Sequence, residues 1–355
     1  MKISFLERTQ NSFHFPKNTQ LWGCVLKNIG MLQNKKILVT GGAGFIGSNL
    51  VEYLLGQKNI VICFDNFSTG KYENIESFRS FDNFKLITAD IRDIESCRSA
   101  MDDVEIVLHQ AAMGSVPRSI KDPKTTNDVN IGGFVNVLIA AKEAGVKRFV
   151  YAASSSTYGD SKALPKVEDK IGKPLSPYAI TKYVNELYAD IFSDLYGMET
   201  IGLRYFNVFG RRQDPEGAYA AAIPKFIRLL IKHQSPVIYG DGSQSRDFTY
   251  IDNVIHANVL AAETTTPKAI NTVYNVAFGE ATTVNDLVVT LKKNLMQFDE
   301  KIAEIMPIYA EIRKGDILHS QASIEKARDL LGYRPQFSLE NGLKEAIRWY
   351  WENLK

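Results

Sequence analysis

The chain has 355 residues, of which 45% are hydrophobic and 23% are charged, and its formal net charge is +2. This length and composition are typical of a globular protein with one large core or two smaller ones. A nearly neutral charge balance, without a block of like charges, argues against a nucleic-acid partner and against an acidic membrane surface. We therefore expect no nucleic acid and no membrane among its partners.

The three cysteines are widely spaced, which argues against a disulfide framework and is typical of a reducing cytoplasm. None of the five histidines has the spacing to a cysteine or another histidine that a metal site needs, so we expect no bound metal. Charged and amide residues interrupt the apolar residues of segment 1–34, which therefore does not resemble a secretory signal. We expect a cytoplasmic protein in which residues 1–34 form an N-terminal extension.

The first strong motif is a glycine-rich turn between a predicted strand, at residues 37–40, and a predicted helix. Glycines recur there at three-residue spacing, and the apolar residues that follow recur at helical spacing. The turn contains Gly41, Gly44, Phe45, Ile46 and Gly47. Such a turn lets a pyrophosphate approach the N–H groups at the helix N-terminus, although the same spacing also occurs in ordinary turns.

A second predicted strand, at residues 60–64, ends at Asp65. A carboxylate at this position of a dinucleotide-binding fold accepts hydrogen bonds from the adenosine ribose hydroxyls. It would also repel the 2′-phosphate of NADP. The sequence therefore favours NAD over NADP, even though Lys71 lies nearby in sequence.

Further predicted strands lie at residues 85–89, 105–109, 149–152 and 199–204, and helical periodicity covers about 123–144 and 177–196. This alternation predicts an α/β fold with a Rossmann-type, doubly wound parallel sheet, which residues 35–207 would form. After residue 207, proline, glycine and charged residues become frequent and the strands become short. We expect residues 208–355 to form mainly a smaller, mixed α/β substrate domain, with a segment near 247–263 returning to the first domain.

Tyr178 and Lys182 stand four residues apart on the predicted helix, so their side chains project from one face. Ser176 suits the N-cap of this helix, and Pro177 suits its first position. An ammonium near a phenol lowers the pKa of the tyrosine from its usual value of about 10, which would make Tyr178 a general base. A half-exposed helix face is the common alternative for this spacing.

Three serines, Ser154, Ser155 and Ser156, follow the predicted strand at 149–152. Serines at the end of a strand most often bond only to the backbone of the turn. Beside a nicotinamide site they could instead bind a substrate hydroxyl and pass its proton to Tyr178.

Taken in order, these motifs resemble the extended short-chain dehydrogenase/reductase family. They are the glycine-rich turn, Asp65-Asn66, Asp90-Ile91, Gln110 to Ala112, Ser154 to Ser156, Tyr178 with Lys182, and Arg204 to Asn207. Within that family, residues 114–119, 207–215 and 313–316 are similar to bacterial UDP-N-acetylglucosamine 4-epimerases, which serve the synthesis of surface polysaccharides such as O-antigen.

The resemblance implies a role for each matching residue. Tyr178 would be the base, Lys182 its pKa partner and a ribose ligand, and Ser154 a contact of the substrate O4. The implied NAD ligands are Gly41, Gly44, Phe45, Ile46, Gly47, Asp65, Asn66, Ser68, Thr69, Gly70, Asp90, Ile91, Gln110, Ala111, Ala112, Asn130, Tyr178, Lys182 and Tyr205. The implied UDP-sugar ligands are Ser115, Arg118, Ser155, Ser156, Asn207, Ala221, Arg246, Arg313, Asp316 and Ser320.

Arginines suit pyrophosphate recognition, because a guanidinium can form two parallel hydrogen bonds to phosphate oxygens. A surface arginine and, at Ser320, a turn serine are the ordinary alternatives for these implied ligands.

The implied activity is a redox-neutral 4-epimerase in which Tyr178 takes the 4-hydroxyl proton while hydride passes from sugar C4 to NAD and back. It would interconvert UDP-N-acetylglucosamine and UDP-N-acetylgalactosamine, or the uronic acid or UDP-glucose forms. A 4,6-dehydratase usually carries an Asp-Glu pair where this chain has Ser155, Ser156 and Thr157. A UDP-glucuronate decarboxylase and an NAD-sensing scaffold protein are further alternatives, although such scaffolds commonly lose the Tyr-Lys pair.

The resemblance also implies a homodimer. The segments near 127–144 and 177–196 match the helices that family members pair across a two-fold axis, which predicts a four-helix interface.

Overall fold

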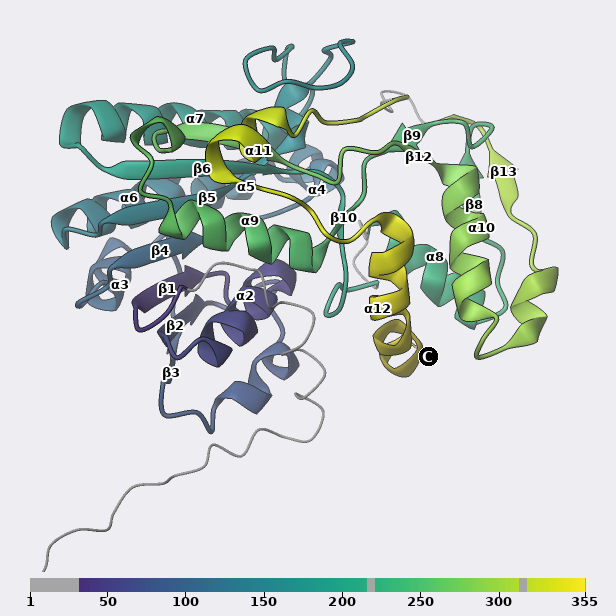
Figure 1. Ribbon diagram of the computed structural model, residues 1–355, viewed down its shortest axis with the longest axis horizontal. Coiled ribbons are helices and arrows are strands. Elements are labelled where there is room, and N and C mark those ends of the chain that lie inside the picture. The colour runs from purple at the N-terminus through teal and green to yellow at the C-terminus, as the bar shows by residue number, and fades with distance from the viewer. Residues whose placement is uncertain (1–31, 216–220, 313–317, 355) are drawn as a thin grey trace, which may run out of the picture.

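The computed structural model describes residues 32–215, 221–312 and 318–354 (Figure 1). Its centre is a seven-stranded sheet in the order β11-β6-β5-β4-β1-β2-β3, and every pairing is parallel. The strands are β1 (Lys36–Thr40), β2 (Ile60–Asp65), β3 (Phe84–Thr88), β4 (Ile106–His109), β5 (Arg148–Ser154), β6 (Glu199–Tyr205) and β11 (Thr272–Val276). The predicted doubly wound parallel sheet is confirmed.

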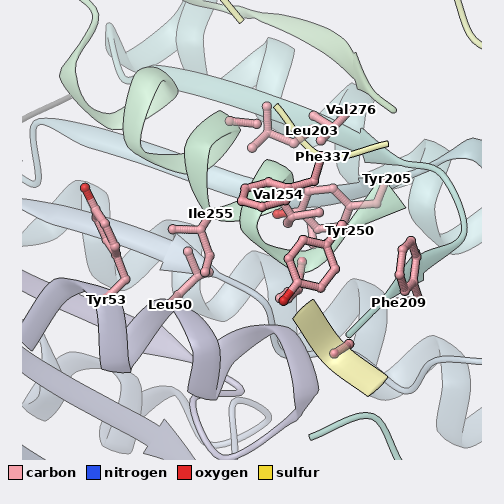
Figure 2. Close-up of a cluster of buried hydrophobic side chains, with 14 of the residues drawn as sticks. Leu50, Tyr53, Leu203, Tyr205, Phe209, Tyr250, Val254, Ile255, Val276 and Phe337 are labelled. Carbon is pink, nitrogen blue, oxygen red and sulfur yellow. The ribbon is translucent and has the colours of Figure 1, made fainter. Parts of the chain in front are cut away.

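Helices cover both faces of the sheet (Figure 1). On one face lie α2 (Phe45–Gly56) and α9 (Ile251–Glu263), and on the other lie α3 (Ile94–Ala100), α6 (Phe134–Glu143) and α7 (Pro177–Tyr196). Figure 2 shows Leu50 of α2 next to Ile255 of α9, in the apolar layer between these helices. Burying an aliphatic side chain of this kind stabilises the fold by about 1.5–3 kcal/mol, so α9 is held firmly on the sheet.

The predicted helix at 123–144 is divided into three parts. After α5 (Pro123–Asn127) comes a π-helical turn, η4 (Asp128–Gly133), and only then α6. A Cβ atom at Gly133 would lie 2.5 Å from the Ile91 side chain, so this glycine allows the helix to approach the loop after β3. π-helical turns often occur at functional sites, and Asn130 lies within this one.

The seventh strand, β11, comes from the second half of the chain, where the sequence analysis did not single out a strand. The remaining elements of that half are short. Three two-stranded sheets join β7 (Val208–Phe209) to β10 (Thr249–Tyr250), β9 (Ser245–Arg246) to β12 (Thr282–Thr283), and β8 (Val237–Tyr239) to β13 (Ile308–Ala310).

The helices of this half are α8 (Ala222–Ile231), α10 (Val284–Leu295), α11 (Glu325–Leu331) and α12 (Leu339–Asn353). Of these, α8, α10 and α12 stand beside the sheet, while α11 packs on β11 and α9 (Figure 1). Among the helices of the described residues, none is long and apolar enough to cross a membrane.

Candidate active site

A cavity of about 530 Å³ lies at the carboxyl ends of the central strands. Most of the residues that the sequence analysis singled out line it. They are Gly41, Gly44, Phe45, Ile46, Gly47, Asp65, Asn66, Ser68, Thr69, Asp90, Ile91, Gln110, Ala111, Ala112, Ser115, Arg118, Ser154, Tyr178, Lys182, Tyr205, Asn207 and Ala221. The fold therefore brings both halves of the chain to one site.

Other predicted residues lie away from the cavity wall. Gly70, Asn130, Ser155, Ser156, Arg246 and Ser320 do not line it, and Arg313 and Asp316 lie outside the described residues. The wall also contains residues that the sequence analysis did not name, among them Met113, Val129, Gln213 and Asp214. The last two belong to the 207–215 motif, which was the available signal, whereas Met113 and Val129 carry no chemical signature.

The glycine-rich turn has the geometry of a phosphate site. Gly41 has a φ of +67°, and a Cβ atom there would lie 2.7 Å from the Ala111 nitrogen, so only glycine fits. A Cβ atom at Gly47 would lie 2.0 Å from the Gly41 oxygen. No side chain caps the N-terminus of α2 at Gly44, which leaves its N–H groups and positive dipole end for an anionic ligand.

Asp65 ends β2 and is held in place by two backbone donors. Its carboxylate accepts hydrogen bonds from the nitrogens of Ala43, at 2.9 Å, and Phe67, at 2.8 Å. Burial raises the pKa of Asp65, and the two N–H groups lower it. Gly70 packs directly beneath this carboxylate, since a Cβ atom there would lie 2.9 Å from its oxygens. Its role is thus to make room for Asp65.

The charge of Lys71, which could otherwise favour the 2′-phosphate of NADP, is paired with a carboxylate. Its ammonium pairs with the carboxylate of Asp214 at 3.1 Å. Together with the carboxylate of Asp65, this pairing fits NAD better than NADP.

Tyr178 and Lys182 lie on the cavity wall at the start of α7, as predicted. The Ser176 hydroxyl caps this helix by accepting a hydrogen bond from the Ala179 nitrogen at 3.1 Å, and Pro177 occupies its first turn. The expected lowering of the Tyr178 pKa is wrong. Burial raises the pKa of Tyr178, and a hydrogen bond with Ser154 opposes this rise.

The Lys182 ammonium donates a hydrogen bond to the Ala152 carbonyl oxygen at 2.8 Å. Burial lowers the pKa of Lys182 to about 8, although the carboxylate of Glu186, one turn further along α7, opposes this. Burial and the charge of Lys182 also lower the pKa of His109 to about 3, so this buried histidine is neutral. Lys182 is therefore a buried cation of the cavity wall, and its charge is sensitive to pH.

Two of the three serines at the end of β5, Ser154 and Ser156, are hydrogen-bonded to each other. The Ser154 hydroxyl oxygen accepts hydrogen bonds from the Ser156 nitrogen, at 3.2 Å, and from the Ser156 hydroxyl, at 2.8 Å. Since both contacts use the Ser154 oxygen as acceptor, its own proton is available to Tyr178 or to a substrate oxygen. Ser156 thus orients Ser154 and does not line the cavity itself.

Asn130 supports the wall from behind. Its side-chain oxygen accepts a hydrogen bond from the Met113 nitrogen at 2.7 Å, and its amide group donates to the Thr181 hydroxyl at 3.1 Å. The π-helical turn therefore fixes the Met113 segment of the wall to α7, next to Lys182.

A buried ion pair anchors the same helix to the sheet. The guanidinium of Arg204 on β6 forms two hydrogen bonds with the Glu186 carboxylate, at 2.9 and 2.7 Å. Removing one partner of such a pair leaves an uncompensated buried charge, which costs about 3–5 kcal/mol. The pair holds α7, which carries Tyr178 and Lys182, in register with β5 and β6.

The chain matches the model of the NAD dependent epimerase/dehydratase family over residues 37–277. The solved UDP-N-acetylglucosamine 4-epimerase of Methanobrevibacter ruminantium, in complex with UDP-N-acetylmuramic acid, is 39% identical with a TM-score of 0.83. That match covers 90% of this chain and 99% of the other. The UDP-glucuronic acid 4-epimerase of Bacillus cereus, in complex with UDP-glucuronic acid and NAD, is 33% identical with a TM-score of 0.80, and the match covers 90% and 100% of the two chains.

The UDP-glucose 4-epimerase of Mycolicibacterium smegmatis is 34% identical over 317 residues, which are 89% of this chain and 98% of that protein. The glycine-rich turn, the uncapped helix N-terminus and Asp65 fit the cofactor of this family, and the Tyr178, Lys182 and Ser154 group fits its chemistry. The chain therefore belongs to the NAD-dependent epimerase/dehydratase family, among its UDP-sugar 4-epimerases, and its cofactor is NAD.

Proposed function

We propose that the protein interconverts UDP-N-acetylglucosamine and UDP-N-acetylgalactosamine through a 4-keto intermediate, for the synthesis of surface polysaccharides. The observation that carries this proposal is that Tyr178 and Ser154 line one cavity together with the dinucleotide-binding turn. The similarity to a UDP-N-acetylglucosamine 4-epimerase supports the N-acetylated substrate. UDP-glucose and the uronic acid forms, named for the other two relatives, are the alternative substrates.

In this proposal the chain handles the proton of the reaction. The Tyr178 phenolate takes the proton of the sugar 4-hydroxyl and later returns it, while the Ser154 hydroxyl hydrogen-bonds the same oxygen. When bound, NAD supplies the acceptor and donor of the hydride at sugar C4. Ser156 leaves the single Ser154 proton free to be donated to the Tyr178 oxygen before substrate binds and to the sugar oxygen afterwards. Donation to Tyr178 opposes the rise in pKa that burial causes.

The carboxylates of the cavity wall argue against the dehydratase alternative, because an elimination needs a free acid and base next to the sugar. The described wall contains Asp65, Asp90 and Asp214. Asp65 binds backbone N–H groups, Asp90 is bonded to Arg92 at 2.7 Å, and Asp214 pairs with Lys71. Each carboxylate thus has another task, and the described wall leaves Tyr178 as the group suited to take a proton.

The proposed assembly is a homodimer in which α7 contributes to a four-helix interface. Apolar side chains at helical spacing form an exposed stripe along α7: Ile180, Leu187, Ile191 and Leu195. Ile191 is 50% exposed and Leu195 is 67% exposed. A continuous apolar stripe of this kind is typical of a surface that another helix covers.

The test is to incubate the purified protein with UDP-N-acetylglucosamine, without added NAD, and to resolve the products by chromatography. We expect UDP-N-acetylgalactosamine to accumulate to an equilibrium. UDP-glucose and UDP-glucuronic acid serve as parallel substrates. Conversion of only one of these would reassign the substrate, and conversion of none would reject the proposed epimerase.

A further inference from the structure

Asp247 is a fully buried carboxylate between β9 and β10 that joins distant segments of the chain. One oxygen accepts hydrogen bonds from the nitrogens of Phe278, at 3.1 Å, and Gly279, at 3.3 Å. The other accepts from the nitrogens of Gly279, at 3.1 Å, and Ala322, at 3.2 Å. Its carboxylate therefore ties the loop after β11 to the segment before α11.

These contacts surround residues that the proposed function assigns to the substrate. Arg246 is the last residue of β9 and directly precedes Asp247. The Ser320 nitrogen donates a hydrogen bond to the oxygen of Ser245, the other residue of β9, at 3.1 Å. The backbone oxygen of Asp247 accepts a hydrogen bond from the Asn207 amide at 2.9 Å, and Asn207 lines the cavity. Three proposed UDP-sugar ligands thus lie around Asp247: Asn207 bonds to its backbone, Arg246 precedes it in the chain, and Ser320 bonds to Ser245 two residues before it.

Burying this carboxylate is costly, since within the described residues its hydrogen-bond partners are backbone N–H groups and no lysine or arginine pairs with it. Burial raises the pKa of Asp247 to about 7, and the N–H groups of Ala322, Gly279 and Phe278 lower it. These groups favour the ionised form because a carboxylate only accepts hydrogen bonds. An apolar residue would avoid this cost but would leave the backbone N–H groups of Phe278, Gly279 and Ala322 without their acceptor, so the carboxylate serves to hold these segments.

We infer that Asp247 is a positioning residue of the UDP-sugar subsite, where its two oxygens fix the 278–279 loop and the 318–322 segment around β9. Asp247 does not line the cavity, so it acts through the ligands that it positions. This inference rests on the proposed function, because Arg246, Ser320 and Asn207 are ligands only in an enzyme that binds UDP-sugars.

The variant Asp247→Asn tests the inference, because asparagine keeps the shape but replaces one acceptor oxygen by an NH₂ group. That NH₂ group faces a backbone N–H, so one of the two segments is released. We expect the Kd for UDP, measured by calorimetry, and the KM for the sugar nucleotide to rise roughly tenfold or more, as for a buried donor that loses its acceptor. The bound NAD and kcat should stay close to those of the wild type.

Asn253→Asp is the matched control. The Asn253 side chain is also buried and bonds to the backbone of a distant segment. Its oxygen accepts hydrogen bonds from the nitrogens of Gln336 and Phe337, and its NH₂ group donates to the Phe337 oxygen at 2.7 Å. In Asn253→Asp the new carboxylate oxygen would face the Phe337 carbonyl oxygen, so two acceptors would oppose each other. This segment contains no proposed substrate ligand. It should lower the melting temperature and leave the Kd for UDP unchanged.

A second variant decides the question if Asp247→Asn does not fold. Gln321→Ala removes a hydrogen bond of 2.8 Å from the Gln321 amide to the Gly279 oxygen, which joins the same two segments near the surface. A several-fold rise in the Kd for UDP, with NAD retained, would support the inference. Wild-type affinity in folded Asp247→Asn, wild-type affinity in Gln321→Ala where Asp247→Asn does not fold, or an equal loss of affinity in Asn253→Asp would overturn it.

Absence of UDP binding and epimerisation in the wild-type protein would instead reject the proposed function itself.

Discussion

The two halves of the molecule are held together in different ways. In the first half, Gly41, Asp65 and Ser154 lie at or just beyond the carboxyl ends of long parallel strands, and Tyr178 lies at the start of α7 on the same cavity wall. In the second half, apart from β11, the strands contain two or three residues and pair only two at a time. The cofactor site therefore sits on a continuous backbone framework, whereas the proposed substrate site does not.

Buried polar side chains replace the missing framework in the second half. Asp247 and Asn253 bind the backbone of distant segments, and the Asn275 amide donates to the carbonyl oxygens of Lys166 and Ser323, both at 3.0 Å. This difference separates two kinds of mutation. Changes at the strand ends of the first half should remove chemistry, whereas changes in the second half should weaken substrate binding.

The largest effect should follow removal of the Tyr178 hydroxyl. Tyr178→Phe keeps the ring but eliminates the proposed base, so turnover should fall by roughly a hundred- to ten-thousand-fold. Absorbance of the purified variant should show unchanged NAD content. Near-normal turnover would end the proposed mechanism.

Lys182→Met should separate catalysis from stability. The folded pKa of Lys182, about 8, lies below its usual 10.5, so the wild-type protein carries the cost of a buried ammonium below pH 8. This cost disappears as the pH rises toward 10.5, because the folded state then loses the proton before the unfolded state does. The shift corresponds to at most about 3 kcal/mol.

We therefore expect Lys182→Met to lose activity and yet to be at least as stable as the wild type at pH 7. Its relative stability should decline at pH 9.5, as measured by urea denaturation at both pH values. A variant that is equally destabilised at both pH values would contradict the assigned pKa.

Ser320→Tyr tests the second half for substrate selection. The resemblance to the 4-epimerases implies that Ser320 borders the C2 substituent of the sugar, where a bulky side chain would restrict the enzyme to unacetylated sugars, although Ser320 lies outside the described cavity wall. Overfilling a packed wall costs about 1–3 kcal/mol, so activity on UDP-N-acetylglucosamine should fall from about five-fold to more than a hundred-fold. Activity on UDP-glucose should fall much less. Equal losses on both substrates would show that Ser320 does not select for the acetyl group.

The smallest effect on turnover should come from the exposed stripe of α7. Leu195→Glu places a charge on a residue that is 67% exposed and outside the cavity wall. The proposed dimer should dissociate while the active site stays intact, which light scattering and an activity assay on the same sample would measure. A wild-type protein that is monomeric at micromolar concentration would refute the dimer.

The sequence predicted the first half well because each signal there is local. Six of the seven strands of the central sheet were predicted to within one or two residues, and α7 matches the prediction from Pro177 to Tyr196. Gly41 and Asp65 lie where two predicted strands end, and ligands of parallel sheets bind at the carboxyl ends of the strands. The strand prediction alone therefore places both residues at the ligand site.

The remaining features depend on contacts between distant residues. β11 joins the central sheet only because α9 carries the chain back across it, and the π-helical turn arises where Gly133 meets Ile91. Burial, which sequence spacing does not reveal, raises the pKa of Tyr178. For the same reason Ser156 was expected at the sugar, whereas its hydroxyl bonds to Ser154.

The most direct test of the central claim follows a deuterium label at C4 of UDP-N-acetylglucosamine. The purified protein, without added NAD, is incubated with this substrate, and both epimers are analysed by mass spectrometry. If Tyr178 and Ser154 move the proton while C4 hydride leaves and returns within one cavity, the product should be UDP-N-acetylgalactosamine that retains the deuterium at C4. Loss of the label to solvent, or a requirement for stoichiometric external NAD, would contradict a redox-neutral epimerase.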